Sequence, residues 1–125
     1  PEHLIKCLRE AAAHKGPSIV IAYAPCINHG IVKGMSGSIT EEKLAVECGY
    51  WPLFRYIPEN AQAGKNPFVL DSGEPNGKLR EYMMGENRFA ALTRTFPETA
   101  ERLFADAETQ CAERYAKYKK MAEEK

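Results

Sequence analysis

The spacing of apolar residues in the first part of the chain predicts a helix followed by a buried strand. Residues 2–14 repeat apolar side chains at helical spacing, with Leu4 and Leu8 on one stripe, and a Gly-Pro pair then ends the helix. Residues 18–24 (SIVIAYA) are an almost continuous β-branched apolar run, which is typical of a strand covered on both faces. A parallel partner for this strand would require a preceding strand. We therefore expect the chain to begin inside a larger α/β fold.

The rest of the chain predicts short elements and one long helix. Pro25 to Gly85 contains eight of the nine glycines and five of the eight prolines, which favours long turns over a layered core. The expected elements are helices at 39–49, 78–84, 86–95 and about 98–123, and strands at 51–57 and 68–70 joined as an antiparallel hairpin. The apolar stripe of the last helix is narrow and comprises Ala100, Leu103, Phe104, Ala107, Cys111, Tyr115 and Tyr118.

Together these elements predict an α/β to α+β fragment. It is expected to be mostly helical, with a buried strand at 18–24 and a short two-stranded hairpin near 51–70, and to end in a long amphipathic helix. We expect residues 1–38 to be the end of an α/β domain and residues 39–125 to be an extension of it.

The charge balance and composition exclude several classes of protein. Lys+Arg and Asp+Glu both total 17, so the chain lacks the basic excess typical of nucleic-acid-binding domains. A hydrophobic content of 44% with no net charge is not the composition of a disordered chain. No apolar stretch approaches the roughly 18 residues of a membrane span, and no secretory signal is visible. We therefore expect a cytoplasmic protein without nucleic-acid or membrane partners.

Among the four cysteines, one position differs from the others. No two cysteines form a CxxC motif, so the spacing predicts no self-contained zinc or iron–sulfur site. Cys7, Cys48 and Cys111 lie in or beside helical patterns and are expected to be small buried or half-buried residues. Cys26 instead follows the apolar run, in the block APCINHG, where a strand-end loop would display a ligand or a reactive thiol.

The residues alone leave other interpretations of this region open. Cys26 and His29 could form a nucleophilic pair, although such pairs are seldom assembled from neighbours in sequence. His29 by itself is equally consistent with a hydrogen-bonded structural histidine. The loop at 30–38 could meet an anion through Lys33 and backbone amides, but it matches neither glycine-rich phosphate-binding motif and is also typical of a flexible connection.

Several distinctive blocks follow one another along the chain. They are GPSIVIAYAPCINHG at 16–30, AVECGYWPL at 45–53 with the adjacent Arg55-Tyr56, GKNPFVLDS at 64–72 and ENRF at 86–89. In this order they resemble the carboxy-terminal part of the pyruvate:ferredoxin oxidoreductases, also called pyruvate:flavodoxin oxidoreductases. The resemblance runs nearly end to end, and it covers only a small part of a far larger enzyme.

The resemblance implies a piece of an enzyme of anaerobic metabolism that oxidatively decarboxylates pyruvate to acetyl-CoA and CO2. Such enzymes use thiamine diphosphate with Mg²⁺, and [4Fe-4S] clusters carry electrons to ferredoxin or flavodoxin. The implied partners are the rest of the polypeptide, a second subunit of a homodimer, coenzyme A and pyruvate. Cys26 matches the fourth cysteine ligand of the cluster nearest the thiamine, and Asn28 and His29 would lie beside that cluster and tune it.

The same resemblance implies what these 125 residues lack. The thiamine and Mg²⁺ segment and the other cluster cysteines are not in the sequence, so we expect the isolated chain to bind neither cofactor and to be inactive. Residues 1–38 would close the thiamine-diphosphate domain, and residues 39–125 would be the C-terminal extension. The alternatives are a free-standing α+β protein-interaction domain without catalysis, or a related 2-oxoacid oxidoreductase. The electron acceptor and the roles of His29 and Lys33 stay open.

Overall fold

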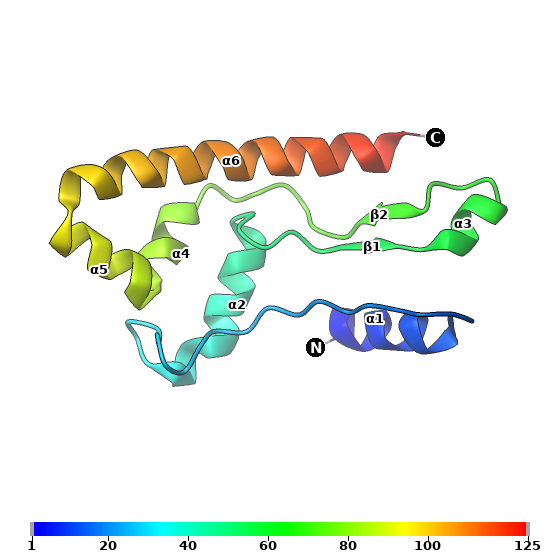
Figure 1. The fold of residues 1–125 in the computed structure, drawn as a ribbon, viewed down its shortest axis with the longest axis horizontal. Coiled ribbons are helices and arrows are strands. Elements are labelled where there is room, and N and C mark those ends of the chain that lie inside the picture. Colours follow the sequence, from blue (N-terminus) through cyan, green and yellow to red (C-terminus); the bar gives the residue numbers. More distant parts are fainter. Residues whose placement is uncertain (1, 125) are drawn as a thin grey trace.

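A computed structural model describes residues 2–124 as a mostly helical α+β fold, which confirms the predicted fold class (Figure 1). The elements in chain order are α1 (Glu2–Ala13), the short 3-10 helix η1 (Met35–Gly37), α2 (Ser38–Glu47), β1 (Phe54–Tyr56), α3 (Pro58–Gln62), β2 (Phe68–Leu70), α4 (Leu79–Gly85), α5 (Asn87–Thr95) and α6 (Pro97–Glu123). No helix among residues 2–124 is both long and apolar enough to cross a membrane.

The long helix α6 forms one edge of the molecule, and α1 lies at the opposite edge (Figure 1). The β1–β2 hairpin contacts α6, and α4 and α5 pack against α6 as well. Helix α2 contacts α4 and runs toward the loop that follows α1. The extended segment after α1 passes along the edge of the molecule before it reaches α2 (Figure 1). This path brings the segment that carries Cys26 close to α4 and α5.

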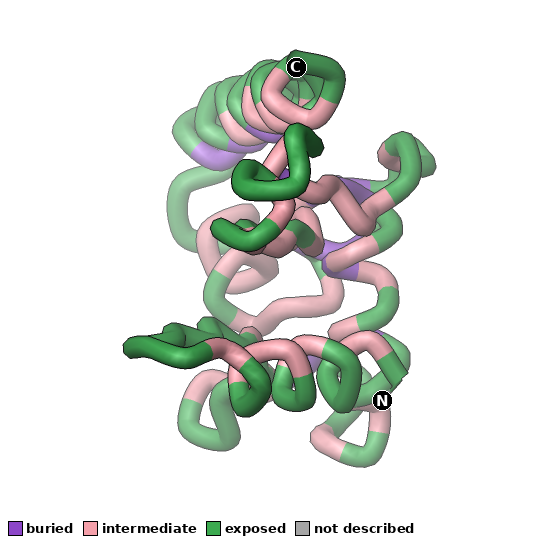
Figure 2. The backbone as a smooth tube through the Cα atoms, turned by 90° about the vertical axis from the view of Figure 1, so that its right-hand side faces the viewer, coloured by how far each residue is buried: buried purple, intermediate pink, exposed green. Residues whose placement is uncertain are grey.

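The hydrophobic core lies between α2, α4 and α6. Its buried members are Ala45 and Cys48 from α2 and the residue after it, Leu79, Tyr82 and Met83 from α4, and Ala100, Phe104 and Cys111 from α6. In Figure 2 the buried stretch of α6 is on the side that faces the rest of the molecule. The predicted stripe of α6 is therefore confirmed at its centre, but it is narrower than predicted, because Leu103 is 40% exposed.

The hairpin is present with short strands. β1 and β2 pair antiparallel, with Arg55 opposite Val69, which confirms the predicted hairpin. Between the strands the chain forms α3, which the sequence analysis missed; Pro58 at its first position suits a helix start because the missing N–H is not needed there. The rings of Phe54, Phe68 and Tyr118 lie 5.1–5.8 Å apart and join the hairpin to α6.

Helix α1 contacts the hairpin through polar side chains. Arg55 donates two hydrogen bonds to Glu10, at 2.7 and 2.9 Å, and two to Asp71, at 2.7 and 2.8 Å. His3 bonds the same Asp71 carboxylate at 2.9 Å. The Arg55 side chain is only 12% exposed, so these charge-assisted bonds are screened less than surface pairs. The polar face of α1 therefore faces the hairpin.

Residues 18–24 do not form the predicted buried strand. The segment pairs with no strand among residues 2–124, and Ile19 and Ile21 are 87% and 75% exposed. On the preceding helix, Leu4 and Leu8 of the predicted stripe are also exposed. A buried strand needs neighbours that accept its backbone hydrogen bonds, and the described part of this chain supplies none at this place. The apolar pattern was identified correctly, but the prediction of a buried strand is wrong for the chain by itself.

Candidate functional site

Cys26 opens a tight turn directly after the extended segment. The backbone N–H of Gly30 donates a 2.7 Å hydrogen bond to the carbonyl of Cys26, which closes the turn over residues 26–30. Gly30 has φ +70°, a conformation that favours glycine. The Cys26 side chain is exposed and forms no disulfide. The turn therefore displays one free thiol at the surface of the described structure.

Tyr23 fixes the chain on the entry side of this turn. Its hydroxyl bonds the Tyr82 hydroxyl at 2.7 Å and donates to Glu86 Oε1 at 3.2 Å. Its ring lies 5.6 Å from the Trp51 ring. Burial raises the pKa of Tyr23 to about 12, further above neutral pH, where a tyrosine hydroxyl is protonated and can donate. The extended segment is thus attached to α4 three residues before Cys26.

Asn87 fixes the chain on the exit side. Its side-chain Nδ2 donates to the carbonyl of His29 at 3.0 Å, and its backbone N–H donates to the carbonyl of Gly30 at 3.3 Å. Ile31 forms an isolated antiparallel bridge with Glu86, and the N–H of the next residue donates to Gly85. The turn is therefore held on both sides by residues 82–87 at the junction of α4 and α5.

The predicted neighbours of Cys26 have different surroundings. Asn28 is exposed, and His29 is half-buried and is held through its backbone carbonyl. The hydrogen bonds recorded for residues 2–124 include none between Cys26 and His29, so nothing in the geometry favours a nucleophilic pair. Lys33 is exposed, and the loop around it is ordered by local turns and by η1.

The other three cysteines are not displayed in this way. Cys48 and Cys111 are buried in the core, and burial raises the pKa of each thiol. Cys7 is half-buried on α1 beside His3, and burial raises its pKa too. A raised pKa lowers the fraction of thiolate, which is the form that binds metals. Among the four cysteines, Cys26 has the surroundings that best suit a ligand.

No group of three or more His, Cys, Asp or Glu side chains in residues 2–124 is arranged to hold a metal ion. A [4Fe-4S] cluster is held by four cysteine thiolates. The one exposed thiol of residues 2–124 would fit only one corner of such a cluster, and the remaining thiolates would have to come from outside the described residues. Residues 2–124 by themselves do not supply the ligands of a complete cluster.

Glu41 carries a buried, unpaired carboxylate beside the α4–α5 junction. Its residue is 8% exposed, and Oε1 has no hydrogen-bond partner among the described residues. A Cβ at position 85 would overlap this carboxylate, so Gly85 leaves the space that the Glu41 side chain of α2 occupies against α4. Burial raises the pKa of Glu41, the neighbouring Glu86 raises it further, and Lys33 lowers it. No motif in the sequence marks Glu41 as a functional residue.

Glu41→Gln is expected to make the free energy of unfolding less dependent on pH. The folded chain holds the Glu41 proton to higher pH than the unfolded chain, in which glutamates titrate at about pH 4.3. The free energy of unfolding therefore falls as pH rises from that value through the raised pKa, by about 1.4 kcal/mol per unit of pKa separation. Glutamine removes this loss, and urea unfolding at a series of pH values measures it.

Glu42→Gln is the matched control, since it removes a carboxylate from the adjacent position of α2. It should keep the pH dependence of the unmodified chain. Equal slopes for the Glu41 variant and the unmodified chain would show that Glu41 does not carry the effect.

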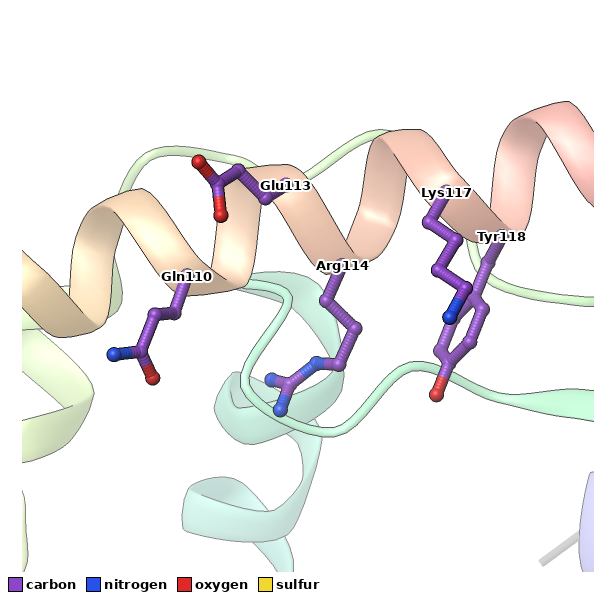
Figure 3. A pocket seen from close by; sticks show the side chains of 5 residues that line it. All are labelled: Gln110, Glu113, Arg114, Lys117 and Tyr118. Atoms are coloured by element: carbon purple, nitrogen blue, oxygen red, sulfur yellow. The ribbon is translucent and has the colours of Figure 1, made fainter.

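A shallow depression of about 390 Å³ lies on α6 (Figure 3). Its lining residues are Gln110, Glu113, Arg114, Lys117 and Tyr118. The Arg114 side chain reaches toward the loop after α2, where Nη2 donates to the carbonyls of Gly49 and Tyr50 at 3.3 and 2.7 Å. Arg114 therefore stabilises the packing of α6 against the loop after α2.

Comparison with known proteins shows that the chain is similar to one segment of much longer oxidoreductases. No family model matches the chain. Pyruvate:ferredoxin oxidoreductase from Moorella thermoacetica is 55% identical over 120 residues, which are 96% of this chain and 10% of that protein. Pyruvate-flavodoxin oxidoreductase from Klebsiella pneumoniae is 46% identical over 123 residues, or 98% of this chain and 10% of that protein. The chain matches one segment of the pyruvate:ferredoxin (flavodoxin) oxidoreductases.

This match confirms the resemblance that the sequence blocks carry. A mitochondrial pyruvate dehydrogenase (NADP+) from Euglena gracilis is also similar, at 40% identity over 119 residues, or 95% of this chain and 7% of that protein. The chain thus spans about a tenth or less of the length of the oxidoreductases it matches. The ENRF block at 86–89 contains Asn87, whose contact with the Cys26 turn could not be recognised without the structure.

Proposed function

We propose that this chain contributes Cys26 as one thiolate ligand of a [4Fe-4S] cluster in a pyruvate:ferredoxin or pyruvate:flavodoxin oxidoreductase. The observation that carries the proposal is the anchored turn: Cys26 alone among the four cysteines is exposed, and the backbone on both sides of it is fixed. If the other three thiolates come from outside these 125 residues, the fourth must be exposed at the surface of this segment to meet them. Cys26 is exposed in this way.

The whole enzyme would oxidatively decarboxylate pyruvate and transfer its acetyl group to coenzyme A, and the two electrons released would leave one at a time to ferredoxin or flavodoxin. When bound, the cluster would supply that one-electron transfer. This chain's share is to hold the Cys26 thiolate at a fixed place and to expose neighbouring backbone amides. None of the backbone–backbone hydrogen bonds among residues 2–124 uses the amides of residues 27–29, so they are open to cluster sulfurs. Asn28 and His29 would lie beside them.

Residues 1–38 would complete an α/β domain whose other strands lie elsewhere in the longer polypeptide. The exposed apolar side chains of α1 and of the 18–24 segment support this, because Leu4, Leu8, Ile19 and Ile21 would be covered there. Thiamine diphosphate with Mg²⁺ would bind in that larger domain. Residues 39–125 would extend from it toward neighbouring domains or the second subunit of a homodimer. The isolated chain would then be inactive, with a single cluster ligand.

Alkylation of Cys26 in the full-length oxidoreductase tests the ligand assignment. Iodoacetamide should leave Cys26 unmodified while the clusters are in place, because a thiolate bonded to iron is not free to react. After removal of iron with a chelator, the same thiol should be alkylated, as shown by peptide mass spectrometry. Buried Cys48 is the internal control and should stay unmodified in both states.

Two results would count against the proposal. Alkylation of Cys26 in the iron-loaded enzyme would show that the thiol is not bonded to a cluster. Protection that persists after the iron is gone would show that burial by another part of the enzyme, and not ligation, shields it.

A further inference from the structure

Two hydrogen bonds connect the Asn87 side chain to the backbone of Cys26 through one peptide group. The first runs from Asn87 Nδ2 to the His29 carbonyl, at 3.0 Å, and the second from the Gly30 N–H to the Cys26 carbonyl, at 2.7 Å. The His29 carbonyl and the Gly30 N–H belong to the same peptide unit. That unit is planar and trans, so the two groups point in opposite directions.

This arrangement makes the Asn87 amide an orienting group for the turn. Because the peptide unit is rigid, a donor that fixes the direction of the His29 carbonyl also fixes the direction of the Gly30 N–H. The Gly30 N–H is the donor that closes the turn on Cys26. Hydrogen bonds in such a chain polarise one another, so each strengthens its neighbour.

The local sequence permits this contact. A Cβ at position 30 would lie 3.0 Å from Asn87 Nδ2, a tight contact, so the glycine leaves room for the amide to reach the backbone without being displaced. The backbone N–H of Asn87 holds the Gly30 carbonyl, at 3.3 Å, and thus fixes the following peptide as well. One residue at the start of α5 therefore determines the direction of two successive peptide groups beside Cys26.

We propose that Asn87 is a positioning residue for the Cys26 thiolate: through the 29–30 peptide it sets how the Cys26 turn presents its sulfur and amides to the cluster. This inference rests on the proposed function of Cys26 and adds a residue that shapes the same site. Loss of the Asn87 amide frees the 29–30 peptide to rotate. The Cys26 thiolate then binds iron less firmly, and the amides near the cluster sulfurs change direction, which moves the reduction potential of that cluster.

The test uses the full-length oxidoreductase with Asn87→Asp and Asn87→Ser. Aspartate is nearly isosteric but replaces the donor with a carboxylate that repels the His29 carbonyl, and serine is a small neutral side chain without the amide. Asn66→Ala is the matched control, because Asn66 Nδ2 likewise donates to backbone carbonyls, those of Met121 and Glu124, at a different place in the fold. Electron paramagnetic resonance follows the potential of each cluster, and iron release to a chelator follows its retention.

Both Asn87 variants should lose iron from one cluster about 10-fold faster or more, which is the effect typical of residues that support a metal ligand. The midpoint potential of that cluster should also shift, while the other clusters and the Asn66 variant stay unchanged. If Asn87→Asp prevents folding, the rate of iron loss and the midpoint potential are compared for Asn87→Ser alone.

The outcomes separate the two proposals. If the Asn87 variants match Asn66→Ala while Cys26 is protected from alkylation until iron is removed, Asn87 has no positioning role and the ligand assignment stands. If Cys26 is alkylated in the unmodified, iron-loaded enzyme, the ligand assignment fails and the role of Asn87 falls with it. Equal changes in all clusters would indicate a general loss of structure and would also overturn the inference.

Discussion

Cys26→Ala in the full-length oxidoreductase is expected to remove one [4Fe-4S] cluster and to lower the rate of ferredoxin or flavodoxin reduction about 100-fold or more. Residues that only support a metal ligand typically cost 10- to 100-fold, and loss of the ligand itself should exceed that range. The chain offers no replacement, since the other three cysteines are buried or half-buried and lie in or beside α1, α2 and α6. Iron content, paramagnetic resonance and acceptor reduction measure the effect.

Cys7→Ala is the matched control for this variant. Cys7 is a free, half-buried cysteine, and the contacts recorded for its thiol are long ones to His3, at 3.7 and 3.9 Å. The enzyme with alanine at position 7 should keep its iron and its rate within a factor of two of the unmodified enzyme, as expected for a substitution outside the site. Full cluster content and full activity in the Cys26 variant would refute the ligand assignment directly.

Local sequence patterns were sufficient to predict most helices and the hairpin. Helix α6 was predicted from the periodicity of its apolar residues, and the hairpin from turn residues between two short β-rich runs. These elements depend on neighbours within a few positions, which the sequence displays. The 18–24 segment has an equally clear pattern, but a strand also needs a partner strand, and periodicity says nothing about whether one is present.

The candidate site divides in the same way. Cys26 was singled out because a proline-interrupted strand end predicts a displayed side chain, which depends only on local sequence. Its anchors Tyr23, Glu86 and Asn87 could not be predicted, since their hydrogen bonds join residues that lie 57 or more positions apart. Which face of α1 packs against the hairpin could not be predicted either. The salt bridges of Arg55 with Glu10 and Asp71 place the polar face of α1 there.

Phe104→Ala should cost the chain about 3–5 kcal/mol in free energy of unfolding, the range for removing a buried aromatic ring. Phe104 is 2% exposed at the centre of the core, and its ring lies 5.7 Å from the Arg80 guanidinium. Alanine removes the ring contacts with α4 and leaves a cavity that the rigid helices cannot close fully. Because one core holds α2, α4 and α6 together, the loss affects the whole fold, including the α4–α5 junction that anchors Cys26.

Leu103→Ala is the matched control, because it shortens the neighbouring residue of the same helix. Leu103 is 40% exposed, so its loss removes less buried surface than the loss of Phe104 and should cost about 1 kcal/mol. Urea unfolding monitored by circular dichroism compares the variants. The midpoint should fall strongly for Phe104→Ala and little for Leu103→Ala. The dependence of the free energy of unfolding on urea concentration should be unchanged if the unfolded states are alike. Equal midpoints for the two variants would show that α6 does not dock through Phe104, and the arrangement of the core would then be wrong.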